Sequence, residues 1–255
     1  MRDFTNQWEL AVKIGSSPVT EYKHTDGLTY IEGRPGSRYV ISIRNDSAER
    51  VCAIPAVDGL SVLDGNEAGL NSPGYIIDPF GTVDIPGWTL NQSEVASFEF
   101  GTVGQSYKVQ SGRGASNVGV IGLMIFREKI HPAHTFRRVQ LTASSYDGGT
   151  VKGGWYGSGA ESATMSATAD SCAQSVGQEM GTGFGEAQTF NTSKVSFTKR
   201  DPNFPDALIA LYYDSARGLE KRGINVAHKG AGTANPFPGY TSNTGCTPPP
   251  GWVKR

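Results

Sequence analysis

The chain has 255 residues, enough for one large β domain with its own hydrophobic core, and its 24 acidic and 23 basic residues leave a net charge of −1. Because the acidic and basic residues nearly cancel, the chain has no overall charge that would attract nucleic acid or an anionic membrane surface, and we expect neither as a partner. No segment approaches the ~20 apolar residues of a membrane span, and the first residues, MRDFTNQWELAVKIG, lack the apolar core of a secretion signal, so we also expect no membrane insertion.

The first two candidate strands are Trp8 to Ile14 and Tyr39 to Ile43, in which apolar and polar side chains alternate. A period of two places one face of a strand on a core and the other face in solvent. The 33 glycines and 14 prolines of the chain predict many turns, and Gly27 and Gly36 can take the positive φ angles that turns require. A hairpin or meander is therefore expected here.

Short apolar runs then alternate with Gly, Pro, Asp and Asn as far as Phe126. The run Val51 to Val57 is followed by two Asp-Gly pairs, at Asp58 and Asp64, which predict tight turns. A pair of strands is expected around Pro79 to Gly81. This spacing of strands and turns is typical of a compact antiparallel β domain.

Two further strands complete this region. The segment Val95 to Phe100 alternates as a half-buried strand does, whereas Asn117 to Phe126 is almost continuously apolar. A continuous run predicts a central strand covered on both faces. Within it, Gly119 and Gly122 would permit a close approach of backbone or a bulge.

Two segments lack the patterns of strands and helices. Residues 141–185 are rich in Ser, Gly, Ala and Thr, and loops of this length are uncommon in compact domains unless they serve binding or assembly. We interpret them as an excursion between two ordered parts. Residues 227–255 have almost no periodicity and are interpreted as an arm that becomes ordered only against something else.

Strand patterns return between these two segments. They cover Ser193 to Thr198 and Ala207 to Asp214, and the second is continuous enough for a buried strand. Ser215 is a suitable N-cap for a short helix that would end at Gly223.

Together these segments predict a mainly β fold, an antiparallel β-sandwich of jelly-roll-like form with a short C-terminal helix and extended arms. Residues 1–140 would form the sandwich and 141–185 the excursion. Residues 186–226 would supply the closing strands and the helix of the same domain, and 227–255 the arm.

No segment carries a recognised catalytic motif such as the G-x-S-x-G elbow of hydrolases, so we expect no enzyme. GTGFGE at 181–186 has the wrong spacing for a dinucleotide loop and is interpreted as a connection with positive φ angles. Asp58 and Asp64 are turn residues whose oxygens could also hold Ca²⁺. His131 and His134 could offer imidazoles to a transition metal, but Pro132 between them disfavours a regular helix or strand that would hold both side chains in place. We predict no cofactor, with calcium at the two aspartates as the alternative.

Aromatic side chains give the candidate binding residues, because exposed rings stack on sugars or anchor protein interfaces. Four have neighbours too polar to build a local core and are the predicted partner-binding residues: Trp155, Tyr156, Tyr240 and Trp252. Four others lie near turns of the β region: Tyr75, Phe80, Trp88 and Tyr107. Trp88 is nevertheless expected to fill the sandwich core together with Phe98, and Cys52, in the apolar run VCAI, is expected there too.

The series VDGLSVLDG, GYIIDPFG, IPGW, VASFEFG and NVGVIGLMIF, followed later by GTGFGE and ALIALYYD, resembles a family of uncharacterised proteins encoded by bacteria and phages. The resemblance extends from about Trp8 to Gly223, and the Ser/Gly-rich excursion and the Pro-rich arm fall outside it. It implies no established activity for individual residues.

These features favour a non-enzymatic structural or attachment protein of a large assembly, with a phage virion as the leading setting: a minor capsid, decoration, vertex or spike component. Its partners would be other protein subunits, including copies of itself, in a virion or similar extracellular particle after synthesis in the cytoplasm. Arms that order on binding lose conformational entropy, which a large interface must offset. The alternative is a carbohydrate-binding or sugar-processing β domain that uses loop aromatics.

Overall fold

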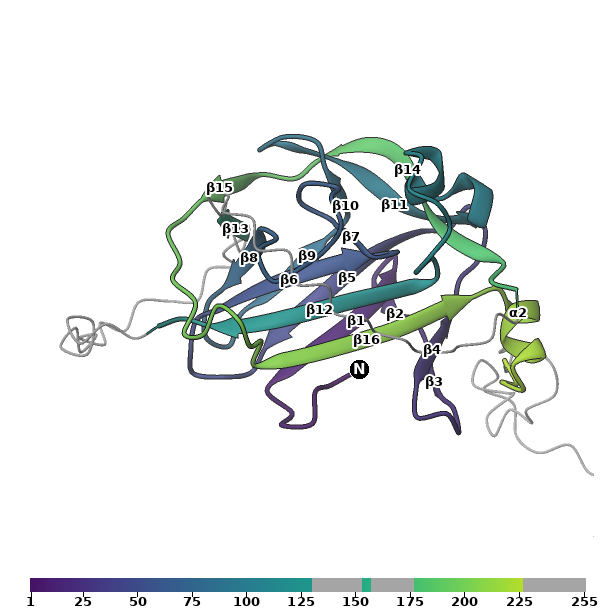
Figure 1. The fold of residues 1–255 in the computed structure, drawn as a ribbon, viewed down its shortest axis with the longest axis horizontal. Coiled ribbons are helices and arrows are strands. Elements are labelled where there is room, and N and C mark those ends of the chain that lie inside the picture. The colour runs from purple at the N-terminus through teal and green to yellow at the C-terminus, as the bar shows by residue number, and fades with distance from the viewer. Residues whose placement is uncertain (130–152, 157–176, 227–255) are drawn as a thin grey trace, which may run out of the picture.

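The computed structural model describes residues 1–129, 153–156 and 177–226, and these residues are mainly β (Figure 1). Two β-sheets enclose one hydrophobic core, so the prediction of a mainly β, sandwich-like fold is confirmed. The strands are β1 (Trp8–Ile14), β2 (Ser17–Pro18), β3 (Glu21–Lys23), β4 (Thr29–Glu32), β5 (Arg38–Asn45), β6 (Val51–Val57), β7 (Leu60–Ser61), β8 (Gly74–Ile77), β9 (Thr82–Ile85), β10 (Gly87–Thr89), β11 (Glu94–Thr102), β12 (Val120–Arg127), β13 (Gly153–Tyr156), β14 (Met180–Thr189), β15 (Thr192–Lys194) and β16 (Ala207–Asp214). The helical elements are the 3-10 helix η1 (Val103–Gln105), α1 (Tyr107–Gln110) and α2 (Ala216–Lys221).

The first sheet has seven strands, in the order β10-β11-β5-β1-β2, with β14 paired to β11 and β9 paired to β5. The second sheet has nine, in the order β15-β13-β8-β6-β12-β16-β4-β3, with β7 paired to β6. Most pairs are antiparallel as predicted, but β16 pairs in parallel with β4, and β13 with β15. The second sheet is therefore mixed. A tight hairpin cannot join parallel strands, so each parallel pair is formed by segments that are far apart in sequence.

The predicted alternation places one face of β1 and β5 in the core. Trp8, Leu10 and Val12 of β1 are buried between the sheets. Leu10 and Val12 lie opposite Ile43 and Ile41 of β5 in the antiparallel register. Removal of this apolar surface from water is the main stabilising contribution to such a core.

The aromatic side chains of the core form a stacked group. Trp88 and Phe98 are buried as predicted and meet edge to face, with ring centroids 5.3 Å apart. Phe98 also stacks on Tyr39 at 5.2 Å. Cys52 is buried as predicted, but Tyr75, placed near a turn by the sequence, is fully buried as well. Neither Trp88 nor Tyr75 can therefore stack on a sugar.

The two strands around Pro79 to Gly81 form, but the prediction that they pair with each other is wrong. β8 pairs with β6 in the second sheet, whereas β9 pairs with β5 in the first. The chain crosses between the sheets here, and the side-chain amide of Asn45 holds the crossing by donating to the carbonyls of Glu49 at 2.8 Å and Asp78 at 3.0 Å.

Residues 180–185, which composition assigns to the excursion, belong to β14, and this strand pairs with β11. None of the glycines of GTGFGE has a positive φ, so their interpretation as a positive-φ connection is wrong. They serve close packing instead. A Cβ added to Gly181 would lie 2.6 Å from Cβ of Ser106, and one added to Gly185 would lie 2.5 Å from Oγ of Ser97.

α2 follows β16 directly and packs on the outward face of the second sheet. The Ser215 hydroxyl caps it by accepting a hydrogen bond from the backbone N–H of Gly218 at 2.9 Å, and Gly223 beyond its end has a φ of +81°. Leu219 of this helix is fully buried. In the ranges described above, no helix is both long and apolar enough to cross a membrane.

Candidate interaction surface

The described residues cover the outward face of the second sheet only partly along its central strand, β12. Ile121, Leu123 and Ile125 of this strand face the core and are buried, while Gly122 and Met124 between them face outward and are half-buried. The described residues therefore do not confirm that β12 is covered on both faces in this stretch. A continuous apolar run does not by itself distinguish a strand that is covered from one that offers an apolar surface to a partner.

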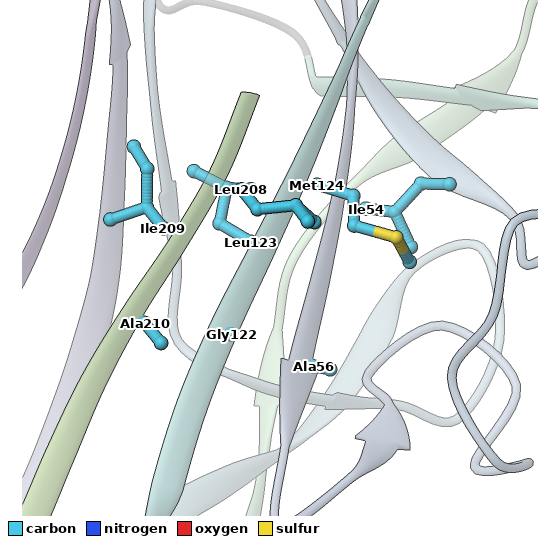
Figure 2. A pocket seen from close by; sticks show the side chains of 8 residues that line it. All are labelled: Ile54, Ala56, Gly122, Leu123, Met124, Leu208, Ile209 and Ala210. Carbon is cyan, nitrogen blue, oxygen red and sulfur yellow. The ribbon is translucent and has the colours of Figure 1, made fainter. Parts of the chain in front are cut away.

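The register of β6, β12 and β16 aligns their outward side chains in rows that cross the sheet, and Figure 2 shows two of these rows side by side. The first row has long side chains: Ile54, Met124 and Leu208. The second row has the smallest ones: Ala56, Gly122 and Ala210. The second row therefore forms a trough beside the ridge of the first, and we call it the apolar trough.

The apolar trough is a hollow of about 340 Å³ lined by apolar side chains. This volume is at the lower end of the ~300–1,000 Å³ of ligand pockets. At its edge Leu208 is 70% exposed. Its floor is open, because among the described atoms a Cβ added to Gly122 would meet just the Cβ of Ala56, at 4.0 Å. This hollow is the candidate interaction surface of the sheet.

One flank of the trough is covered by the segment after β15. Only the beginning of the predicted strand Ser193 to Thr198 belongs to β15, and the rest lies over the outward face of the sheet. Phe197 packs there against a buried cluster that includes Ile54 and Phe126. The Lys199 ammonium lies 4.0 Å from the centroid of the Phe126 ring, a cation–π contact.

The other flank is covered by α2 and the residues that follow it. Ile224 and Val226 are buried in a cluster with Tyr30, against which Tyr212 packs. Tyr212 pairs with Val120 of β12, one row beyond the trough. Among the residues that the structure places, both flanks of this face are thus covered and the trough between them is open.

The predicted partner-binding residues are distributed between β13 and the arm. Trp155 and Tyr156 lie in β13, where Trp155 is opposite Tyr75 of β8, so their backbone belongs to the second sheet and not to a loop excursion. Tyr240 and Trp252 lie outside the described residues, as do His131 and His134.

Asp58 forms the predicted tight turn, and its side chain is buried. Asp58 and Gly59 have φ angles of +53° and +79°, the signs of a type I′ turn, and they join β6 to β7. The carboxylate is 1% exposed and accepts hydrogen bonds from the N–H groups of Gly119 and Thr182 and from the Tyr213 hydroxyl, at 2.9, 3.0 and 2.6 Å. Burial raises the pKa of the Asp58 carboxyl, and these hydrogen bonds partly oppose that shift. A calcium ion at Asp58 would have to displace these donors.

Hydroxyl groups extend this network across the core. The Tyr213 hydroxyl uses its hydrogen in the bond to Asp58. Thr182 must therefore donate to Tyr213, and Tyr39 must donate to Thr182, each over 2.8 Å. Burial raises the pKa of both tyrosines well above its usual value. Tyr39 and Thr182 belong to strands of the first sheet, Tyr213 belongs to the second, and Asp58 lies in the turn that joins β6 to β7 of the second. The four residues form a polar clamp between the sheets.

Asp64, the second aspartate of the calcium prediction, is exposed and accepts a hydrogen bond from the backbone N–H of Asn66 at 3.1 Å, as a turn residue does. Its partner in that prediction, Asp58, is committed to the polar clamp. In the part of the chain that the structure describes, no three His, Cys, Asp or Glu side chains come together as a metal site would require.

No family model, no curated protein and no solved structure matches this chain. The resemblance to uncharacterised bacterial and phage proteins stays a prediction.

Proposed function

We propose that this chain is a non-enzymatic structural protein of a large protein assembly, and specifically a minor capsid, decoration, vertex or spike component of a phage virion, built on a jelly-roll-like sandwich. The observation that carries the proposal is the apolar trough, an open apolar surface with Leu208 70% exposed at its edge. Covering it with another subunit removes apolar surface from water, at about 25 cal/mol per Å². The protein would work in a virion or a similar extracellular particle.

The polar clamp supports a structural role over a catalytic one. Asp58, Thr182, Tyr213 and Tyr39 are all buried and are hydrogen-bonded to one another in series. Fully satisfied networks of this kind rigidify a core and specify a single arrangement of its parts. A rigid sandwich is what a repeated subunit needs if its contacts are to be reproduced in every copy.

A carbohydrate-binding domain is the second candidate, and one observation favours it. Tyr107 and Phe184 lie side by side with ring centroids 5.0 Å apart, and Phe184 is 44% exposed. Such a pair could stack on a sugar ring. Binding to a glycan that is lost in Phe184→Ala would favour this candidate, and the absence of binding across a broad glycan array would count heavily against it.

The assembly proposal is tested by density-gradient sedimentation of the native source material, with the chain followed by mass spectrometry. We expect it in a megadalton particle fraction. Recovery only as a soluble species of the monomer mass, 27.2 kDa, would overturn the proposal.

The substitution Leu208→Asp is expected to weaken assembly at least about tenfold, a loss of ~1.4 kcal/mol, because a carboxylate at the trough would be desolvated in the contact. Folding stability should change by no more than about 0.5 kcal/mol, since the side chain is exposed in the isolated chain. Sedimentation velocity measures the first quantity and urea unfolding the second.

Phe80→Asp is the matched control, because Phe80 is also 70% exposed but lies in the crossing between the sheets, and its φ of +58° suits aspartate. This variant should assemble as the wild type does. Normal assembly of Leu208→Asp would show that the trough is not the surface that contacts another subunit.

A further inference from the structure

We propose that the partner received by the apolar trough is the segment 227–255 of a second copy of this chain. The inference rests on the proposed function and names the contact that would build the assembly. It follows from three features: the shape and chemistry of the trough, the composition of the segment, and the place where the chain leaves the described fold.

The trough fits a narrow apolar occupant. Successive outward rows of a sheet are about 7 Å apart, so the single row of small side chains in the trough has about the width of one extended chain or one aromatic ring. Gly122 makes the floor open, and Met124 in the adjacent ridge has an adaptable side chain. The lining residues that the structure describes are apolar and carry no charge, so they select an occupant by apolar surface.

The segment has the complementary composition. From 230 to 253, GAGTANPFPGYTSNTGCTPPPGWV, it contains no charged residue and five prolines. Its aromatic residues Phe237, Tyr240 and Trp252 are of the type that anchors interfaces by filling apolar pockets. Prolines restrict the free chain, so less conformational entropy is lost when it binds.

The length of the segment points to a second copy. The chain leaves the described fold at Val226, which is buried in the cluster with Tyr30 and Tyr212, one row from the trough. A few residues would be enough to reach the trough of the same copy, so the segment is much longer than binding to its own trough requires. Trp252 comes 26 residues later, which spans up to ~85 Å when extended. A segment binding a different surface on the next copy is a heterologous contact, which generates rings or open assemblies.

The test uses two full-length variants that lose opposite halves of the contact. Gly122→Val fills the trough, and the open floor and the strand preference of valine allow it to fold. The double substitution Tyr240→Ala with Trp252→Ala removes two anchors from the segment. Gly104→Val is the matched control, because Gly104 is exposed with no atom within 4 Å of an added Cβ and lies in η1, away from the trough.

Sedimentation velocity and mass photometry give the readout, at a concentration where the wild type assembles. We expect Gly122→Val and the double variant each to be monomeric when alone, with an assembled fraction at least tenfold smaller than that of the wild type. Mixed together, they should form a one-to-one heterodimer of twice the monomer mass, since each supplies the half that the other lacks. The Gly104→Val control should assemble normally.

Each contrary outcome has its own meaning. Assembly of Gly122→Val at the wild-type level, or two monomeric variants that form no heterodimer, would overturn this proposal while leaving the assembly function in place. A wild-type chain that remains monomeric at every concentration, and is absent from particle fractions, would overturn both.

Discussion

Replacing Asp58 with alanine is expected to destabilise the protein by about 3–5 kcal/mol, because three buried donors lose their acceptor at once. These donors are the N–H groups of Gly119 and Thr182 and the Tyr213 hydroxyl. The Thr182 and Tyr213 hydroxyls also lose the charge that orients them. The free energy of unfolding in urea, measured at neutral pH, gives the size of the effect.

Asp58→Asn separates the charge of this residue from its shape. The amide keeps the volume but places an N–H₂ donor toward a backbone donor, so we expect a smaller loss than in Asp58→Ala. Burial raises the pKa of Asp58, which means that the folded state holds its proton more tightly than the unfolded state. Its contribution to stability is therefore largest in acid and decreases as pH rises through the interval above the ordinary carboxyl pKa. The stability advantage of the wild type over Asp58→Asn should shrink across that interval.

Asp64→Ala provides the control for both aspartate variants. Asp64 follows the same sequence pattern, an Asp-Gly pair, but it is exposed and accepts one local hydrogen bond from Asn66. Its removal should cost less than about 1 kcal/mol. Equal losses at Asp58 and Asp64 would contradict the role assigned to the polar clamp.

Gly87→Ala is the second variant expected to have a large effect. Gly87 lies in β10 opposite Ser97 of β11, and a Cβ at this position would be 2.0 Å from the carbonyl oxygen of Ala96. Backbone cannot yield as a side chain does, so β10 must separate from β11, and the neighbouring Trp88 must shift in the core. We expect a loss of about 3 kcal/mol or more, the upper range for overpacking.

Thermal unfolding with tryptophan fluorescence measures this loss and the displacement of Trp88 together. Gly104→Ala is the comparison, since nothing lies within 4 Å of a Cβ added there. Wild-type stability in Gly87→Ala would mean that β10 and β11 are not packed as closely as described.

The strands with clear two-residue alternation were accessible from the sequence. β1, β5 and β11 each place alternate apolar residues in the core, and this pattern needs no knowledge of the partner strand. The turn at Asp58 was equally accessible, because Asp-Gly favours two successive positive φ angles. Burial of Phe98 followed from the alternation of Val95 to Phe100.

Features that depend on pairing between distant segments were not accessible. β14 has a Gly-rich sequence typical of a loop, and it becomes a strand because β11 offers a long edge on which small residues fit closely. β8 and β9 look like a hairpin in sequence, yet the crossing held by Asn45 sends them to different sheets.

The apolar trough could not be found from single strands either. Ala56, Gly122 and Ala210 are unremarkable small residues until the register of three strands places them in one row. The outward position of Gly122 and Met124 was a hint, but a continuous apolar run also fits a strand that is covered on both faces. The trough is defined by the sizes of side chains that lie next to one another across three strands, and these residues are not neighbours along the chain.

The most direct measurement is hydroxyl-radical footprinting of the assembled particle compared with the dissociated chain. Met124 and Leu208 report on the trough, and Phe80 reports on an exposed surface elsewhere. We expect modification of Met124 and Leu208 to slow severalfold in the particle while that of Phe80 is unchanged. Equal modification of Met124 and Leu208 in both states would show that the trough stays open in the assembly, and would contradict the account.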